Sequence, residues 1–335
     1  MFRVASVGLG WWSNELAKAV HGKSGKLRIA SCFSRSEDKR AAFAEAFECG
    51  QHESYEALLA DPAIDAVILT TPHSLHAEHV MQAAKAGKHV FVEKPFTLTA
   101  ESGERAAAAC REAGVVLAVG HNRRFSAAGQ VIKALLDEGY FGTLLHIEAN
   151  FSAPSGLSYS PERWRASRVE SPGGGLAGLG VHMIDLIAWL GGPVRGVLGQ
   201  AVRRAIPVDV DDTTSALFEL ASGATGYLGC SSVAPYTSFL NVYGTKANAF
   251  AAVDGDRVEL QSAGEQAKPR PLQAVETLRA ELEEFAAACA GKASYRVTPA
   301  EAIHTVAVMQ AIVDSAENGG RAVAVAGNEN GQAAN

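Results

Sequence analysis

The segment Gly8-Leu9-Gly10-Trp11-Trp12-Ser13 constrains the fold of this chain more than any other feature. It follows an apolar run at positions 2–7 and precedes a helical pattern from Asn14. A glycine-rich turn of this spacing between a strand and a helix is typical of a dinucleotide-binding unit. The first glycine permits the tight turn, the second lets the backbone approach a pyrophosphate, and the third position must be small. We therefore expect Gly8, Gly10, Trp11, Trp12 and Ser13 to contact a dinucleotide, although Ser13 departs from the usual Gly or Ala.

The first 120 residues alternate strand and helix patterns, which predicts βαβ units and a parallel sheet. The expected strands cover residues 2–7, 27–33, 64–70, 89–92 and 115–119. The expected helices cover residues 14–20, 37–47, 74–86 and 100–113. This part of the chain should form a Rossmann domain over residues 1–122.

The pattern changes after residue 122. A helix is expected at 126–138, a strand at 144–151, a loop to 175, a helix near 181–190, several strands between 194 and 260, and two closing helices. Strands in a run, with helices before and after, indicate an α+β arrangement. We predict an α/β chain whose second domain, residues 123–326, has a large and mostly antiparallel open sheet, followed by a disordered tail at 327–335.

Composition narrows the class of protein. Hydrophobic residues make up 47% of the 335 and charged residues 20%, as in globular proteins. No apolar run approaches the roughly 20 residues of a membrane span, and the N-terminal residues do not resemble a signal peptide. The five cysteines are scattered, which suggests a reducing compartment. We expect a cytoplasmic protein without a membrane partner.

The charges and histidines favour a small-molecule partner. The formal charge is −6 and the basic residues are dispersed, so no nucleic-acid partner is expected. No metal site is expected either, because His73, His76 and His79 lack neighbouring acidic or thiolate ligands apart from Glu78.

The end of the second expected strand bears on cofactor choice. An acidic residue there would bind the adenosine ribose of NAD, whereas this chain has Ser34-Arg35-Ser36. A guanidinium and hydroxyl groups suit a 2′-phosphate. We predict that Ser34 and Arg35 favour NADP(H), with NAD(H) possible as the alternative.

Two further strand ends carry candidate site residues, because ligands of parallel sheets gather at the carboxyl ends of strands. Thr71, Pro72 and His73 leave one strand, with His76 in the following turn, and Glu93-Lys94-Pro95 leaves another. A lysine here can donate a hydrogen bond to a substrate oxygen beside the nicotinamide. We expect Thr71, Pro72, His73, His76, Glu93 and Lys94 to line the cofactor.

The chain resembles the glucose–fructose oxidoreductase/inositol dehydrogenase (Gfo/Idh/MocA) family over nearly its whole length. The resemblance rests on Gly8-Leu9-Gly10, Thr71-Pro72, His76, Glu93-Lys94-Pro95, Arg124-Phe125, Trp164-Arg165, the run from Gly173-Gly174-Gly175 to Gly180-Val181-His182-Met183-Ile184-Asp185, and Pro299-Ala300-Glu301-Ala302. It implies hydride transfer between NAD(P) and an alcohol carbon of a sugar, polyol or related compound. It also implies a homodimer or homotetramer through the second domain's sheet.

The resemblance also implies roles for individual residues. Lys94 corresponds to the catalytic lysine, and His182 corresponds to the residue that takes or gives the hydroxyl proton. A histidine suits that exchange because its ordinary pKa lies near neutrality. Arg124, Trp164, Arg165 and Asp185 correspond to substrate-side positions, although Asp185 could be structural.

The sequence departs from the family at two positions. Gly178 stands where the family usually has an aspartate four residues before the histidine, and His73 stands where it often has Asn. Three functions therefore remain open: a dehydrogenase or reductase in which Lys94 and His182 suffice, a lyase or glycosidase that retains its cofactor, and a non-catalytic dinucleotide-binding sensor.

Overall fold

The computed structural model describes residues 1–252, 254 and 257–326. The predicted tail at 327–335 lies outside these residues. The chain forms two compact units. The first comprises residues 1–97, 101–122 and 276–302, and the second comprises residues 98–100, 123–275 and 303–335. No helix of the described part of the chain is both long enough and apolar enough to cross a bilayer.

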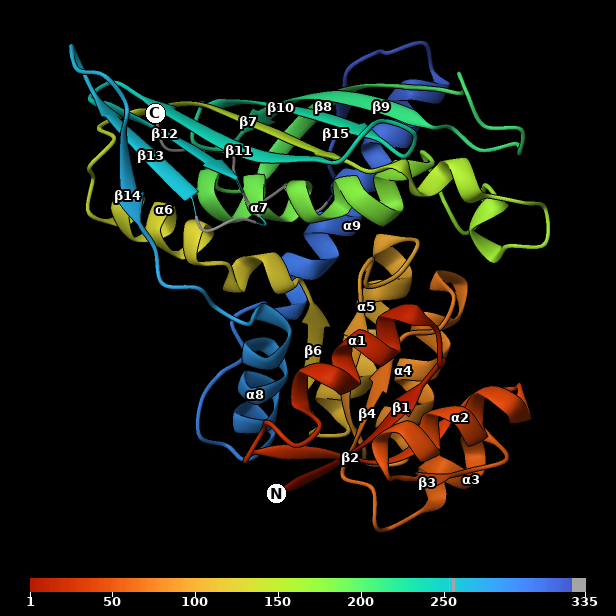
Figure 1. Ribbon diagram of the computed structural model, residues 1–335. Helices are drawn as coiled ribbons and strands as arrows, with labels where there is room; N and C mark the ends of the chain where they lie inside the picture. The colour runs from red at the N-terminus through yellow and green to blue at the C-terminus, as the bar shows by residue number, and fades with distance from the viewer. Residues whose placement is uncertain (253, 255–256, 327–335) are drawn as a thin grey trace. The chain divides into compact units, whose positions relative to one another are not determined.

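The first unit is built on a parallel sheet with the strand order β3-β2-β1-β4-β5-β6 (Figure 1). Its strands are β1 (Phe2–Val7), β2 (Leu27–Phe33), β3 (Gly50–Gln51), β4 (Ala66–Leu69), β5 (His89–Glu93) and β6 (Leu117–Gly120). Every pairing in it is parallel. From β1 the chain adds strands first on one side, β2 and β3, and then on the other, β4 to β6, as in Rossmann folds. The predicted fold of this part is therefore confirmed.

Helices cover this sheet. They are α1 (Trp11–Val20), α2 (Glu37–Phe47), α3 (Tyr55–Ala60), η1 (His73–Leu75), α4 (His76–Lys85), α5 (Ala100–Glu112), η2 (Asn122–Phe125) and α8 (Thr277–Cys289). Of these, α5 begins in the 98–100 stretch of the second unit, and η2 continues into that unit after Asn122. α4 packs against β4 and β5, whereas α1, α2 and α8 pack against β2.

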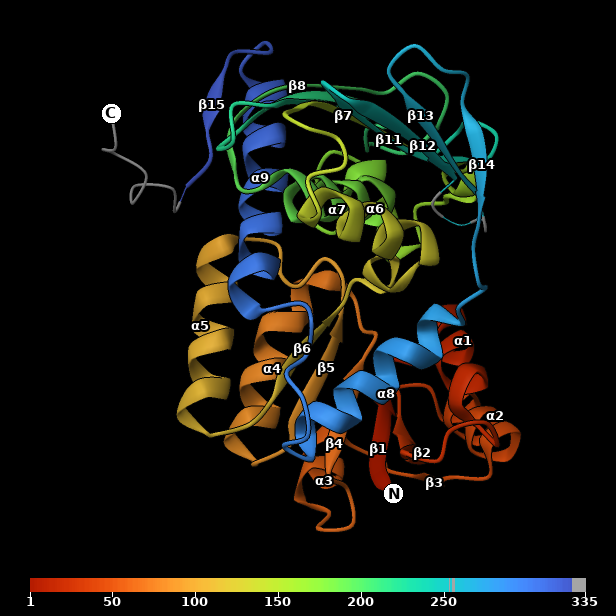
Figure 2. The ribbon, with the colours of Figure 1, turned by 90° about the vertical axis from the view of Figure 1, so that its left-hand side faces the viewer.

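One helix departs from the predicted division of the chain. α8 follows the strands of the second unit in sequence but packs against α1 (Figures 1 and 2). Its buried residues Leu282, Phe285 and Ala286 supply an apolar face, and the rings of Phe285 and Phe91 lie 5.8 Å apart. The predicted boundary at residue 122 puts this helix in the second domain, because sequence order does not reveal which sheet a returning helix covers.

The second unit contains a nine-stranded sheet with the order β14-β13-β12-β11-β7-β10-β9-β8-β15. Its strands are β7 (Leu144–Ser152), β8 (Val194–Val202), β9 (Thr213–Leu220), β10 (Thr225–Ser231), β11 (Thr237–Gly244), β12 (Ala247–Ala252), β13 (Arg257–Ser262), β14 (Lys268–Pro271) and β15 (Val323–Ala324). β7 and β10 are parallel and the other pairs are antiparallel. The predicted large, mostly antiparallel sheet is therefore confirmed.

Helices cover one face of this sheet, as both ribbon views show. They are α6 (Ala127–Asp137), α7 (Val181–Gly191) and α9 (Pro299–Glu317), of which α9 begins in the 276–302 stretch of the first unit. Between β7 and α7 the chain forms the short turns η3 (Pro154–Ser158) and η4 (Trp164–Ala166) and the π-helical turn η5 (Leu176–Gly180). Apolar residues of α7 such as Ile184 and Ile187 are fully buried.

Candidate active site

Gly8 sits where β1 meets the end of β4. Its φ is +90°, and a Cβ at this position would come within 2.8 Å of the Thr70 carbonyl group and the Thr71 nitrogen. The Thr70 hydroxyl donates to the Gly8 carbonyl oxygen at 2.5 Å. Only glycine meets both the torsional and the steric demand, so the turn that leads into α1 depends on Gly8.

Gly10 leaves room for a ligand at the start of α1. A Cβ added to Gly10 would meet no atom within 4 Å, and α1 has neither a side-chain cap nor an acidic residue in its first turn. Unsatisfied N–H groups at a helix N-terminus attract anions such as a pyrophosphate. The buried Nε1 of Trp12 also lacks a hydrogen-bond partner among the described residues, and Trp11 is 73% exposed. These features fit a dinucleotide.

The structure explains the departure at Ser13. Its side chain is buried between α1 and β1, and its hydroxyl lies 3.1 Å from the hydroxyl of Ser6. The polar group of the third motif position is therefore satisfied within the core, so helix and strand still pack closely. In the sequence, this contact corresponds to a serine in the first strand, Ser6, and a serine at the third motif position, Ser13.

The end of β2 presents a basic side chain. Arg35 is exposed and has no hydrogen bond or ion pair with another described residue. Ser36 caps α2 by accepting from the Lys39 backbone N–H at 3.4 Å, and the Ser34 carbonyl accepts from Arg40 at 2.7 Å. The loop is thus fixed by Ser34 and Ser36, while the Arg35 guanidinium faces solvent.

His76 joins the chain segments that follow β4 and β5. The imidazole is fully buried, with Nδ1 2.9 Å from the Pro95 carbonyl oxygen and Nε2 3.0 Å from that of Thr71. Burial lowers the pKa of His76, although both carbonyl partners act in the opposite direction. Because both ring nitrogens face backbone carbonyls, His76 joins the segments after β4 and β5 at this edge of the sheet. Its contact with a cofactor stays a prediction. His73 and Thr71 are also buried beside it.

Lys94 follows β5 and is half-buried. Its backbone N–H donates to Glu93 Oε2 at 3.2 Å. Glu93 is buried, and a Cβ at Gly120 would lie 2.8 Å from its Oε1, so the glycine on β6 makes room for this carboxyl. The Glu93 carboxyl group is therefore enclosed at the end of β5, one residue before the predicted catalytic lysine.

Glu281 is a second buried acid near Glu93, which sequence reasoning missed. It belongs to α8, is fully buried, and neither carboxyl oxygen has a hydrogen-bond partner among the described residues. Burial raises the pKa of Glu281 well above its usual range, and the negative charge of Glu93 adds to this effect. Glu281, Phe285 and Cys289 are spaced four residues apart and so share one helical face. This spacing could have indicated that Glu281 lies on the buried side of the helix.

In the second unit, His182 lies in the first turn of α7 and is 4% exposed. Its ring packs edge-on against Phe151 of β7, with centroids 5.8 Å apart. The guanidinium of Arg123 stacks on the same Phe151 ring at 4.0 Å and donates to Asp254 at 2.6 Å. Phe151 thus contacts both the predicted proton-transfer residue and a buried guanidinium, and sequence reasoning identified neither Phe151 nor Arg123.

The glycines before His182 differ sharply in their surroundings. At Gly174, φ is +60° and a Cβ would lie 1.6 Å from the Asp211 carbonyl oxygen, so no other residue fits. At Gly178, within η5, a Cβ would meet nothing within 4 Å. The missing aspartate at Gly178 therefore does not reflect a lack of space.

Arg124 and Asp185 form a buried ion pair within the second unit. Arg124 Nε and Nη2 each lie 2.8 Å from a carboxylate oxygen of Asp185, and both side chains are 1% exposed. In this bidentate geometry each residue neutralises the charge of the other. Both Asp185 and Arg124 therefore have a structural role in this ion pair. A substrate contact by either residue stays a prediction.

Trp164 and Arg165 lie together in η4. The Arg165 guanidinium stacks on the Trp164 ring at 4.1 Å, and the Arg165 carbonyl accepts from the Ser171 hydroxyl at 2.9 Å. The two predicted substrate-side residues thus form one surface, carried by the segment 153–175.

Two models of one protein family match the chain. The model described as "Oxidoreductase family, NAD-binding Rossmann fold" matches residues 2–121, and the one described as "GFO/IDH/MocA C-terminal domain" matches residues 130–250. Together they cover more than half of the chain.

Individual relatives agree with these matches. A Bacillus subtilis protein named scyllo-inositol 2-dehydrogenase (NADP(+)) is 40% identical over 167 residues, and an Escherichia coli 2,7-anhydro-N-acetylneuraminate hydratase is 31% identical over 196. The matches cover 49% and 58% of this chain, but only 44% and 50% of these relatives. Among solved structures, the chain resembles a protein from Desulfitobacterium hafniense that is provisionally described as an NADPH-dependent oxidoreductase. The two sequences are 32% identical, and the structures align over 97% of both chains with a TM-score of 0.90.

Proposed function

Because this chain belongs to the Gfo/Idh/MocA family of oxidoreductases, we propose that it transfers a hydride between a nicotinamide dinucleotide and an alcohol or carbonyl carbon of a sugar, polyol or related small molecule. The observation that carries this proposal is the open space beside Gly10 at the uncapped start of α1. A pyrophosphate held there would be stabilised by the helix N-terminus. Trp12 Nε1 and the residues after β4 and β5 would complete the contacts.

The cofactor we favour is NADP(H), with NAD(H) as the competitor. Arg35 is exposed beyond β2 with no partner among the described residues, and Ser34 and Ser36 flank it. No carboxylate occupies the end of β2, where it would bind a ribose hydroxyl of NAD. A guanidinium suits the charge and shape of a 2′-phosphate.

We assign the chemistry to Lys94 and His182. The dinucleotide, when bound, would accept or supply the hydride. The Lys94 ammonium would donate a hydrogen bond to the reacting oxygen and stabilise the negative charge that develops on it. His182 would accept the hydroxyl proton during oxidation and return it during reduction. Trp164 and Arg165 would contact the rest of the substrate.

Gly178 favours a second candidate, a lyase or glycosidase that oxidises its substrate transiently and retains the cofactor. The family's usual carboxylate is absent there, and one relative is named a hydratase. A non-catalytic dinucleotide sensor is the third candidate and would also tolerate this glycine.

Titration with NADPH and NADH, followed by a screen of sugars, polyols and their oxidised forms, tests these functions. Net change in the absorbance of the reduced nicotinamide would support the dehydrogenase. Product formation without such a change would favour the lyase, and cofactor binding without any product would favour the sensor. Absence of dinucleotide binding would overturn all three.

We also propose that the uncovered face of the nine-stranded sheet joins copies of this chain. Leu198 of β8 and Leu217 of β9 are directly paired across the sheet and are 46% and 52% exposed. Exposed apolar neighbours on one face are typical of subunit contacts. Light scattering of the purified protein would show a dimer or tetramer, and a monomer would contradict the proposal.

A further inference from the structure

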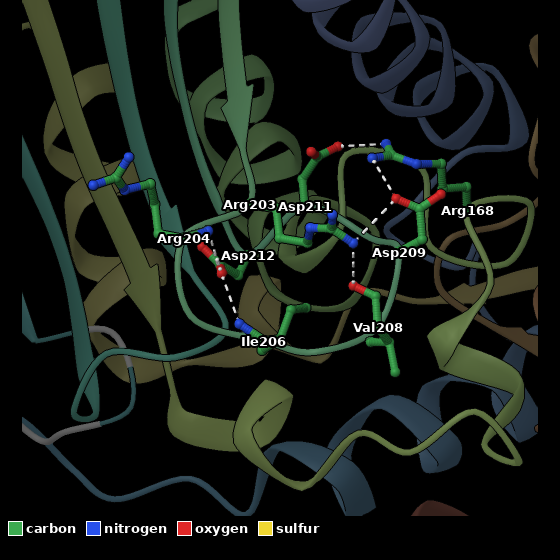
Figure 3. Close-up of polar contacts among 8 residues, drawn as sticks. All are labelled: Arg168, Arg203, Arg204, Ile206, Val208, Asp209, Asp211 and Asp212. Atoms are coloured by element: carbon green, nitrogen blue, oxygen red, sulfur yellow. Dashed lines mark hydrogen bonds and ion pairs between the residues drawn. The ribbon is translucent and has the colours of Figure 1, made fainter.

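Arg168 connects two loops of the second unit (Figure 3). It lies in the segment 153–175, which also carries Trp164 and Arg165. Its Nη1 lies 3.0 Å from Oδ2 of Asp211, and its Nη2 lies 3.3 Å from Oδ1 of Asp209. Both aspartates belong to the loop 203–212 between β8 and β9. One guanidinium therefore holds two carboxylates of the facing loop.

The loop 203–212 is itself firmly fixed. Asp212 is fully buried, and its Oδ2 accepts from the backbone N–H groups of Arg204, Ala205 and Ile206 at 2.7, 2.7 and 3.2 Å. Burial opposes the ionisation of Asp212, but these hydrogen bonds outweigh it and hold its pKa below the usual range. Arg203 adds hydrogen bonds to the Val208 carbonyl and to Asp209, at 3.2 and 3.3 Å. The loop offers Arg168 a preorganised partner.

Apolar contacts join the same two loops. Ile206, Val208 and Val210 form a buried cluster, and Tyr159 and Ala166 from the segment 153–175 pack against it. Ala166 directly follows the Trp164–Arg165 pair, and Arg168 lies three residues after Arg165. The position of that pair therefore depends on contacts made within three residues of it.

We propose that Arg168 is a positioning residue for substrate binding: through Asp209 and Asp211 it holds the Trp164–Arg165 surface in its binding conformation. This inference rests on the proposed function. The side chains of Arg168, Asp209 and Asp211 are 51%, 75% and 15% exposed, so solvent weakens each ion pair. Loss of Arg168 should therefore raise KM by about 3–10-fold and leave kcat within about twofold.

The test compares Arg168→Ala and Arg168→Lys with Arg204→Ala. The guanidinium of Arg204 points away from the network in Figure 3, so its removal changes the charge of the same region without breaking an ion pair. We expect Arg168→Ala to raise KM, Arg168→Lys to raise it less, and Arg204→Ala to leave it unchanged, all with unaltered NADPH affinity. Unchanged KM in Arg168→Ala, or an equal rise in Arg204→Ala, would overturn the proposal.

A readout without substrate separates this inference from the proposed function. Chymotrypsin can cleave the segment 153–175 after Tyr159 and Trp164. In Arg168→Ala this segment lacks its ion pairs to the loop 203–212, so it should be cut several-fold faster than in the wild type or in Arg204→Ala. Asp209→Asn, at an exposed side chain, should show the same direction. Equal cleavage rates would overturn the role of Arg168 whatever the turnover. Faster cleavage in a protein that turns over no sugar or polyol would contradict the proposed function alone.

Discussion

The Nδ1 atom of His76 lies 2.9 Å from the carbonyl oxygen of Pro95, and the other ring nitrogen faces the Thr71 carbonyl. His76 thereby links the segments after β4 and β5, and Lys94 immediately precedes Pro95. A neutral imidazole has one N–H group, so replacement by alanine leaves one buried carbonyl group without its hydrogen-bond donor. We expect His76→Ala to lower the free energy of unfolding by about 1–3 kcal/mol, measured by urea denaturation. His146→Ala, which removes a surface hydrogen bond to Thr225, should cost less than about 0.5 kcal/mol.

The same variant should show a pH signature. Burial lowers the pKa of the His76 imidazole below its ordinary value of 6.5, so protonation favours the unfolded chain. The stability that neutral His76 contributes is present above that ordinary value and is lost as the pH falls through the lowered folded pKa. Between about pH 7 and pH 5, His76→Ala should lose less stability than the wild type. Parallel curves would contradict this account of the imidazole.

Lys94→Met tests the assignment of the catalytic lysine. Loss of a charged donor to the reacting oxygen should lower kcat by about 10²–10³-fold, while NADPH affinity stays within a few-fold. Lys23→Met removes the same charge from an exposed turn after α1 and should behave as the wild type. Steady-state kinetics with fluorescence titration of the cofactor would decide. Retention of most activity would exclude Lys94 from the chemistry.

Arg35→Asp tests the cofactor preference. A carboxylate at this position repels a 2′-phosphate and can accept from a ribose hydroxyl. Loss of a charge-assisted hydrogen bond should weaken NADPH by about 10–100-fold, with NADH unchanged or tighter. Arg111→Asp, on the exposed side of α5, is the matched control. If the ratio of the two dissociation constants does not change, Arg35 does not contact the cofactor.

Replacement by alanine should affect stability much less at Gly178 than at Gly174. Gly178→Ala enters open space in a helical turn and should change the free energy of unfolding by no more than about 1 kcal/mol in either direction. Gly174→Ala would place a methyl group against the Asp211 carbonyl at a positive φ and should cost more than about 3 kcal/mol or prevent folding. Similar thermal denaturation midpoints for the two variants would contradict these surroundings.

Gly178→Asp then asks whether the missing carboxylate limits redox turnover. An increase in kcat with the best sugar or polyol would support the dehydrogenase with an incomplete pair. Loss of a cofactor-retaining activity in the same variant would instead favour the lyase.

Sequence patterns predicted the elements around the cofactor site well, because short-range signals define them. The predicted bounds of β1, β2 and α2 agree with the structure, and the cap at Ser36 was visible as a serine before two acidic residues. β3 and α3 were missed, since two and six residues carry too little periodicity. Element type therefore followed from local pattern, and the shortest elements did not.

The sequence suggested candidate site residues, which stay predictions, but it did not reveal their contacts. The motif around Gly8 and Gly10 indicated where a dinucleotide would lie, and the two glycines have the geometry that this requires. The pairing of Arg124 with Asp185 depends on how η2 and α7 meet, 61 residues apart in sequence. Likewise, Glu281 reaches the neighbourhood of Glu93 only because α8 returns to the first sheet. One sequence does not specify such distant neighbours.

The return of α8 has a consequence for biosynthesis. A ribosome that has completed β6 has made every strand of the first sheet, yet α8, which covers α1 and β2, is still more than 150 residues away. Until then, the nascent chain exposes the apolar surface that Phe285 and Leu282 will bury. A fragment ending at residue 122 should therefore be an aggregation-prone intermediate instead of an independent domain, and chaperones would have their main opportunity during synthesis of the second sheet.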